Sequence, residues 1–203
     1  ARPDGPMNLY QAVPLACSEE GRGAGVLAVF SDTIYSGRDI RKSNSYKTDA
    51  FEIGHFGSLG YMRDDQVCFL SRSRRPRTCS SPFSGMEITH LPRVSIAYWH
   101  CGADIGILDH MCEHSDGIVL AGSGSGNYGS TWQKHLHELA SRHFIVRASR
   151  VPQGIVFDSP IFDPQGDTIP AYTFSPHKAR ILLMLALLKT RDREEIRRLF
   201  AIC

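Results

Sequence analysis

Short apolar runs alternate with longer stretches of helical periodicity along most of the chain. The runs are bounded by polar or glycine-rich segments, which is typical of buried strands. Between them, apolar side chains recur every three or four positions, which predicts helices. The expected strands are residues 25–31, 93–101, 115–127 and 144–151. The expected helices are residues 6–20, 104–114, 129–143, 175–190 and 192–203. Ser175 is expected to cap its helix, with Pro176 at the first helical position.

Alternation of strands with helices of this length predicts a parallel sheet covered by helices on both faces, because each crossover helix packs back onto the sheet. The run at 25–31 is likewise expected to be a buried parallel strand. Residues 71–93 mix Arg, Ser, Pro and Thr with few apolar side chains and are predicted to be a linker. The pattern therefore predicts an α/β protein with one part on each side of that linker.

The composition is that of a globular protein, with 203 residues of which 42% are apolar and 22% charged. A formal net charge of +2 gives no general attraction to nucleic acid or to a membrane surface. One basic cluster, Arg72, Arg74, Arg75 and Arg77, lies in a Ser/Pro-rich setting that favours a solvated linker over a nucleic-acid site. The apolar stretch at 179–190 is too short to span a bilayer, and no signal-peptide pattern is visible. We expect neither a nucleic-acid partner nor a membrane partner.

The six cysteines form no CxxC pair, and their lack of evident pairing favours a reducing compartment. They lie at positions 17, 68, 79, 101, 112 and 203. The densest group of metal-binding residue types is His100, Cys101, His110, Cys112 and His114, but its spacing matches no known ligand module. We expect the cysteines to face a core, the histidines to lie on a helix surface, and the chain to bind no metal.

A glycine-rich loop at 121–130 follows an expected strand and precedes an expected helix. It reads G-x-G-x-G-N rather than G-x-G-x-x-G, and no acidic residue ends the next strand, so a dinucleotide site is disfavoured. Glycines at the carboxyl end of a strand still let a ligand or another chain approach the backbone, and Asn127 adds an amide that can donate and accept hydrogen bonds. On the next helix, His135 and His137 point in different directions, which predicts structural roles.

One lysine closes a stretch of strand and turn, VLAVFSDTIYSGRDIRKSN, at residues 26–44. The apolar run leads into a turn, and Gly37, Arg38 and Asp39 lead to Lys42. Loops held by a rigid scaffold are common places for catalytic side chains. Lys42 is therefore a candidate catalytic residue.

Seven motifs, taken together and in order, resemble the bacterial type II L-asparaginases and the related glutaminase-asparaginases. They are DGPMNLYQAV, SDTIYSGRDIRKSN, GSLGYM, LPRVSIAY, SDGIVLAGSGSGN, VRASRVPQG and SPHKARILLMLALLKTRDREEIRRLF. The resemblance implies a two-domain α/β enzyme that hydrolyses the side-chain amide of asparagine, with glutamine as a second candidate substrate. It implies no cofactor, a homo-oligomer built as a dimer of dimers, and a cytoplasmic or periplasmic location.

The same resemblance divides the chain and assigns its site residues. Residues 1–70 would be the end of a larger parallel-sheet N-terminal domain, and residues 94–203 a complete smaller C-terminal domain of parallel strands flanked by helices. Lys42 would accept a proton from a threonine, and Asp39 with Arg38 would position its loop. Asn127, with Gly126 and Ser125, would support the substrate-binding shell of a neighbouring subunit.

Two parts of the family pattern are not found in the 203 residues. The nucleophilic threonine and a T-D-T segment would both precede DGPMNLY, and Thr33 in SDTIYSG does not align with either. A glutamate expected after SRV aligns with Pro160 or Ile161, where Asp158 or Asp163 could stand in. We therefore expect the chain to be incomplete and inactive alone. The alternative is a non-catalytic relative that at most binds a small amino acid or self-associates.

Overall fold

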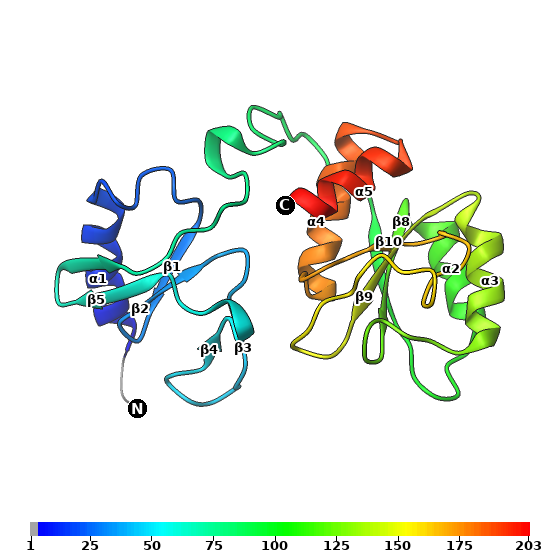
Figure 1. Cartoon of the computed structure of the whole chain (residues 1–203), viewed down its shortest axis with the longest axis horizontal. Helices are drawn as coiled ribbons and strands as arrows, with labels where there is room; N and C mark the ends of the chain where they lie inside the picture. The colour runs from blue at the N-terminus through cyan, green and yellow to red at the C-terminus, as the bar shows by residue number, and fades with distance from the viewer. Residues whose placement is uncertain (1–3) are drawn as a thin grey trace. The chain divides into compact units, whose positions relative to one another are not determined.

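The computed structural model describes residues 4–203, apart from the side chain of His55. The chain forms two compact units, Ala1–Ser84 and Gly85–Cys203, and each is described by itself (Figure 1). The division falls within residues 71–93, the stretch that composition marks as a linker. Part of this stretch belongs to the first unit, because Arg77 Nε donates a hydrogen bond to the carbonyl of Gly23 at 3.0 Å.

The first unit packs a helix, α1, against an antiparallel four-stranded sheet in the order β1-β2-β5-β6. Its elements are α1 (Gly5–Cys17), β1 (Leu27–Phe30), β2 (Thr33–Ser36), β3 (Arg41–Lys42), β4 (Phe51–Glu52), η1 (Gly54–Phe56), β5 (Gly60–Arg63), β6 (Gln66–Phe69) and η2 (Thr78–Ser80). Strands β3 and β4 form a separate antiparallel pair. The first unit's core joins Leu15 of α1 to Ile34 and Met62 of the sheet.

The prediction of a parallel strand at 25–31 was wrong. Strand β1 pairs antiparallel with β2 across a two-residue turn, and both turn residues, Ser31 and Asp32, have positive φ angles of 47° and 59°. This is the backbone of a tight hairpin, whose short connection forces the two strands to run in opposite directions. The turn lacks the usual glycine, so the sequence carried only a weak hairpin signal. Among the described residues, every strand pair of the first unit is antiparallel.

Helix α1 exposes several large apolar side chains along one side. They are Met7, Leu9, Tyr10 and Val13. Its opposite side buries Gln11, whose Nε2 donates to Asp32 Oδ1 at 2.6 Å and so ties the helix to the β1–β2 turn. A contiguous apolar surface of this kind is often covered by another chain or segment.

The second unit is a parallel four-stranded sheet in the order β10-β9-β8-β7, with helices on both faces (Figure 1). Its elements are β7 (Val94–Tyr98), α2 (Gly106–His114), β8 (Gly117–Gly122), α3 (Ser130–Ala140), β9 (Phe144–Ser149), β10 (Ile169–Pro170), α4 (Pro176–Lys189) and α5 (Arg193–Ile202). Helices α2 and α3 cover one face, while α4 and α5 cover the other. The predicted parallel sheet and its helices are confirmed here. The two-residue β10 was missed because so short an element has no periodicity.

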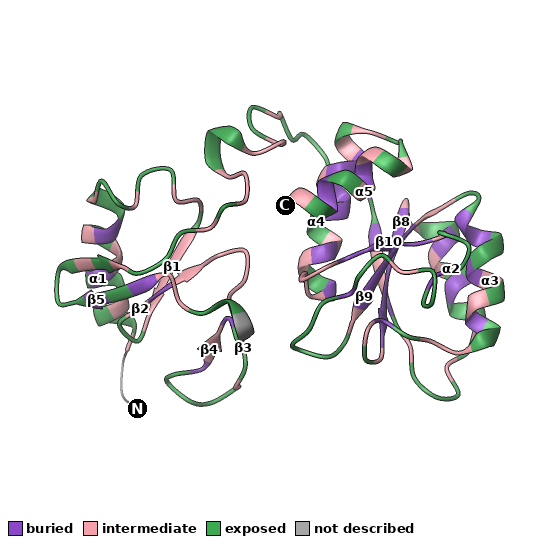
Figure 2. Ribbon diagram, viewed as in Figure 1, coloured by how far each residue is buried: buried purple, intermediate pink, exposed green. Residues whose placement is uncertain are grey.

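Strand β8 lies at the centre of this unit, and all six of its residues are buried (Figure 2). Ile118 and Leu120 face α2 and α3 in one apolar cluster. Gly117 lies under α4, where an added Cβ would come within 2.9 Å of Leu183 Cδ2. A continuous apolar run is what a strand buried on both faces requires.

Two helices of the second unit begin at side-chain caps. Ser175 accepts a hydrogen bond from the Lys178 amide, which confirms the predicted cap of α4. Asp192 Oδ1 accepts from the amides of Glu194 and Glu195 at 2.8 and 3.2 Å at the start of α5. Each cap satisfies amides that have no partner inside the helix.

The six cysteines differ in exposure, and the expectation that they face a core is wrong for four exposed ones, Cys17, Cys68, Cys79 and Cys101. Cys112 lies in the core cluster beneath α2, where burial and the nearby Asp109 raise the pKa of its thiol to about 11. Cys101, on the loop before α2, is exposed. Among residues 4–203, no helix combines the length and the apolar character needed to cross a bilayer.

Replacing Asp192 with alanine is expected to lower the free energy of unfolding by about 1 kcal/mol, because two amides at the start of α5 lose their acceptor. The matched variant Asp192→Asn keeps an acceptor oxygen and should stay within a few tenths of a kcal/mol of the parent protein. Urea unfolding followed by circular dichroism measures both. Equal stability of the two variants would show that the cap does not contribute.

Cys112 is expected to react with iodoacetamide at pH 9 at least about tenfold more slowly than Cys101, because a thiol of pKa near 11 is only about 1% thiolate at that pH. Peptide mass spectrometry after timed quenching measures both rates in one sample. The difference should vanish in concentrated urea. Fast labelling of Cys112 in the folded protein would contradict its place in the core.

Candidate functional site

The turn after β2 is fixed by close backbone contacts around Gly37. Its amide donates to the Val26 carbonyl at 2.8 Å, and an added Cβ would come within 3.0 Å of that oxygen and 2.8 Å of the Val26 Cγ1 atom. The next two residues, Arg38 and Asp39, form an ion pair with each other, and both side chains are largely buried. This arrangement is consistent with the loop-positioning role expected for the pair.

Lys42 is the second residue of β3 and is exposed within the first unit. Its Cα pairs with Phe51 on β4, and its ammonium nitrogen lies 5.9 Å from the centroid of the Phe51 ring. That ring contacts Phe30 edge to face at 4.5 Å. The preceding residue, Arg41, anchors the pair of strands through Glu52 at 2.6 Å. Lys42 therefore sits on a braced strand, with an aromatic face beside its charge.

Thr33 lies at the start of β2, immediately after the β1–β2 turn. Its hydroxyl donates to the Ser31 carbonyl at 3.2 Å and closes the turn locally. Thr33 is thus part of the hairpin, and its hydroxyl stabilises the turn.

The glycine loop after β8 folds back tightly on the end of its own strand. An added Cβ on Gly122 would come within 2.4 Å of the Gly126 backbone, and one on Gly126 would come within 3.1 Å of the Ala148 carbonyl. Gly126 also has a φ of 86°, which favours glycine. These glycines are therefore required for the loop to pack against the sheet.

Backbone amides of the glycine loop donate hydrogen bonds within the loop itself, which argues against a phosphate site. The amides of Gly126 and Asn127 both donate to the Ser123 carbonyl, at 2.9 and 2.7 Å. A dinucleotide-binding loop instead points free amides at its ligand. The Asn127 side chain is exposed, and within the described part of the chain no hydrogen bond to its carboxamide is seen. The backbone of Asn127 is thus held by a hydrogen bond, and its side-chain carboxamide is exposed.

Arg147 on β9 is the residue that holds this loop in place, and the sequence analysis missed it. Its side chain is 1% exposed. The guanidinium donates to the Ser125 carbonyl at 2.8 Å and to the Phe157 carbonyl at 2.7 Å, while Nε reaches Thr168 Oγ1 at 3.3 Å. One buried cation therefore joins the glycine loop, the segment after β9 and the approach to β10. The available signal was an arginine inside the apolar run FIVRAS.

The buried carboxylate of Asp163 is linked to Arg147 through the hydroxyl of Thr168. Asp163 Oδ2 accepts from the amide and the hydroxyl of Thr168 at 2.8 and 2.6 Å. Burial lowers the pKa of Arg147, and the negative charge of Asp163 opposes that shift. Burial and Asp163 together raise the pKa of Tyr128 to about 12, so this phenol beside the loop stays neutral at physiological pH.

Neither aspartate proposed to replace the family glutamate is free in this unit. Asp163 is buried, and its second oxygen accepts from the Asp167 amide at 3.0 Å. Asp158 binds Arg197 at 2.9 Å.

The candidate residues fall into two groups, one in each unit. Arg38, Asp39 and Lys42 lie in the first unit, and Ser125, Gly126 and Asn127 lie in the second. Each group is ordered by contacts inside its own unit.

The two histidines of α3 take separate partners. His135 Nε2 lies 2.7 Å from Asp109 Oδ1 on α2, and His137 Nδ1 lies 2.9 Å from Asp167 Oδ2. The expectation that they point in different directions is confirmed, while their structural role stays a prediction.

Comparison with known families gives matches on both sides of the linker. The family model described as "Asparaginase, N-terminal" matches residues 1–75, and the model described as "Glutaminase/Asparaginase C-terminal domain" matches residues 93–200. L-asparaginase 2 of Escherichia coli is 35% identical over 200 residues, which cover 97% of this chain and 58% of that protein. Glutaminase-asparaginase of Pseudomonas fluorescens is 35% identical over 201 residues, or 97% of this chain and 55% of that protein.

Among solved structures, the probable cytoplasmic L-asparaginase from Campylobacter jejuni is similar to this chain with a TM-score of 0.92 and 38% identity. The match covers 98% of this chain and 64% of that one. The chain thus spans a little more than half the length of the curated relatives it matches.

Replacing Arg147 with lysine is expected to lower the free energy of unfolding by about 2 kcal/mol, because one ammonium cannot serve three divergent acceptors in a buried site. Amide hydrogen exchange at Gly126 and Asn127 should also accelerate. The matched control is Arg150→Lys, because Arg150 is exposed and its Nη1 donates to the Trp99 carbonyl at 3.2 Å. Equal effects of the two substitutions would contradict the role given to Arg147.

Proposed function

The chain belongs to the glutaminase/asparaginase family, and we propose that it acts in hydrolysis of the side-chain amide of asparagine to aspartate and ammonia. The observation that carries this proposal is the match of both family models, in order, over residues 1–75 and 93–200. Glutamine is the second candidate substrate, since relatives named glutaminase-asparaginase match as well.

Lys42 is proposed as the proton acceptor of this reaction. A neutral lysine amine takes the proton of a threonine hydroxyl, and the oxygen attacks the amide carbon. The carbon–nitrogen bond breaks, the leaving nitrogen is protonated and departs as ammonia, and water then hydrolyses the acyl-enzyme. In the family pattern this threonine precedes the region matched here, so the proposal pairs Lys42 with a hydroxyl outside these 203 residues.

This role sets a physical condition on the surroundings of Lys42. A lysine amine is neutral only when it is removed from water or lies beside another positive charge. Within residues 4–84 the side chain is exposed, so the covering surface must come from beyond this unit. A substrate-bound assembly meets the condition. The exposed apolar side of α1 is a surface that such an assembly can bury.

Asn127 is proposed to reach the site of a neighbouring subunit in a dimer of dimers. Its exposed carboxamide and its backbone, fixed through Ser123 and indirectly through Arg147, support this assignment. We propose a cytoplasmic or periplasmic location, as for named relatives.

The second candidate is a non-catalytic relative that binds a small amino acid or self-associates. One observation favours it. Asp158 and Asp163 are the two candidates to replace the substrate-binding glutamate, and both bind partners within their own unit. Binding of aspartate without ammonia release would support it.

The test joins this chain to the segment that precedes the matched region in the Escherichia coli relative. We expect the fusion to release ammonia from asparagine, and Lys42→Met to lower kcat by about 10²- to 10⁴-fold, the usual contribution of a proton-transfer group. The matched control is Lys47→Met, an exposed lysine five residues further along, which should leave kcat unchanged.

Two outcomes would count against the proposal. One is an inactive but folded fusion that binds aspartate, which favours the non-catalytic alternative. The other is equal kcat for Lys42→Met and Lys47→Met. The 203-residue chain alone is expected to release no ammonia, and release that depends on Lys42 would place the nucleophile inside these residues.

A further inference from the structure

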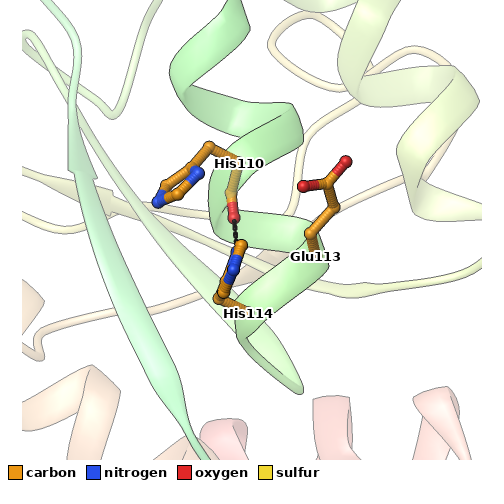
Figure 3. Close-up of side chains that lie close together, drawn as sticks. All are labelled: His110, Glu113 and His114. Atoms are coloured by element: carbon orange, nitrogen blue, oxygen red, sulfur yellow. Dashed lines mark hydrogen bonds between the residues drawn. The ribbon is translucent and has the colours of Figure 1, made fainter.

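Helix α2 carries three exposed side chains of metal-ligand type on one side. His110, Glu113 and His114 are spaced i, i+3 and i+4, so they lie side by side on the helix surface. One ligand atom from each lies within 4.8 Å of the others (Figure 3). The two imidazole rings are 4.4 Å apart between centroids and inclined by only 32°. Two ring nitrogens and one carboxylate oxygen therefore lie near one another on the surface of α2.

One contact fixes the tautomer of His114 in the form that binds metal. Its Nδ1 lies 2.8 Å from the backbone carbonyl oxygen of His110 (Figure 3). A carbonyl oxygen can only accept, so Nδ1 carries the hydrogen of the neutral ring and Nε2 carries the free electron pair. Histidines that bind metals commonly donate their second ring nitrogen to a backbone carbonyl, which orients the ring and strengthens the ligand.

The position of the cluster on the helix also favours a cation. Helix α2 ends at His114, where the last carbonyl groups point away from the helix and give its end a partial negative charge. On the other side of the same helix, Cys112 is buried in the core. The thiol is therefore excluded from the cluster, and the ligand set is two nitrogens and one oxygen.

We propose that His110, Glu113 and His114 bind a zinc ion, with water completing the coordination. Imidazole and carboxylate ligands suit zinc, whereas magnesium and calcium prefer sites made of oxygen. Zinc–ligand bonds of about 2.0–2.2 Å require the three ligand atoms to draw closer than 4.8 Å, which rotation of exposed side chains provides. This proposal departs from the expectation of no metal. The sequence analysis named His110 and His114 together with His100 and two cysteines, and it overlooked Glu113.

Zinc titration by calorimetry tests the proposal, with the exposed thiols first blocked by iodoacetamide. We expect one ion per chain. His114→Gln should weaken binding more than about tenfold, because a ligand is lost. Glu113→Gln removes the charged ligand and should weaken it to a smaller extent. The matched control, His90→Gln, changes an exposed histidine outside the cluster and should leave binding unchanged.

The same samples give a structural readout that does not depend on affinity. Zinc should shift the ring proton resonances of His110 and His114 and leave those of His90 in place. It should also raise the unfolding midpoint of the parent protein but not that of His114→Gln. Absence of zinc binding, or binding unchanged in His114→Gln, would overturn the proposal. A folded circular-dichroism spectrum for each variant keeps loss of binding distinct from loss of fold.

Discussion

The buried guanidinium of Arg147 is the constraint on which the candidate loop of the second unit depends. A charge removed from water is destabilising unless polar groups replace its hydration. Here two backbone carbonyls, one hydroxyl and a carboxylate behind that hydroxyl do so. These acceptors come from three segments that are remote in sequence. The hydrogen bonds that solvate the cation therefore also hold the three segments together.

The glycines and Arg147 both determine how the loop after β8 packs. The glycines do so because they lack a side chain, and Arg147 does so through its hydrogen bonds. Gly122 and Gly126 allow backbone to approach backbone without a side chain between them. Arg147 then holds the Ser125 carbonyl, one residue from Gly126. Asn127 follows directly, with its backbone bonded to Ser123 and its carboxamide exposed. Because the Asn127 backbone is already ordered, its exposed side chain loses little further conformational freedom when it binds a ligand or a second chain.

The sequence predicted the second unit well because its elements are long and buried on known faces. The all-apolar β8 and the cap Ser175 illustrate this: local pattern and tertiary role agree. In the first unit, β1 was misassigned because a short apolar run fits both a parallel strand and a hairpin arm, and the Ser31–Asp32 turn has no glycine. The contacts of Arg147 could not be predicted, since they depend on carbonyls whose directions only the folded chain defines.

Lys42 and Arg147 are both cationic, but they differ in burial, and burial limits what each side chain can do. Arg147 is fully enclosed and bound by fixed acceptors, so it cannot take part in a proton transfer and serves to position others. Lys42 lies on a strand braced by Arg41 and Glu52, with its amine exposed beside Phe51. The strand fixes where the amine lies, and the amine is exposed to solvent. A covering surface that excluded this water would alter the proton affinity of the amine without moving the backbone. In the function proposed for Lys42, assembly around the first unit would supply such a surface.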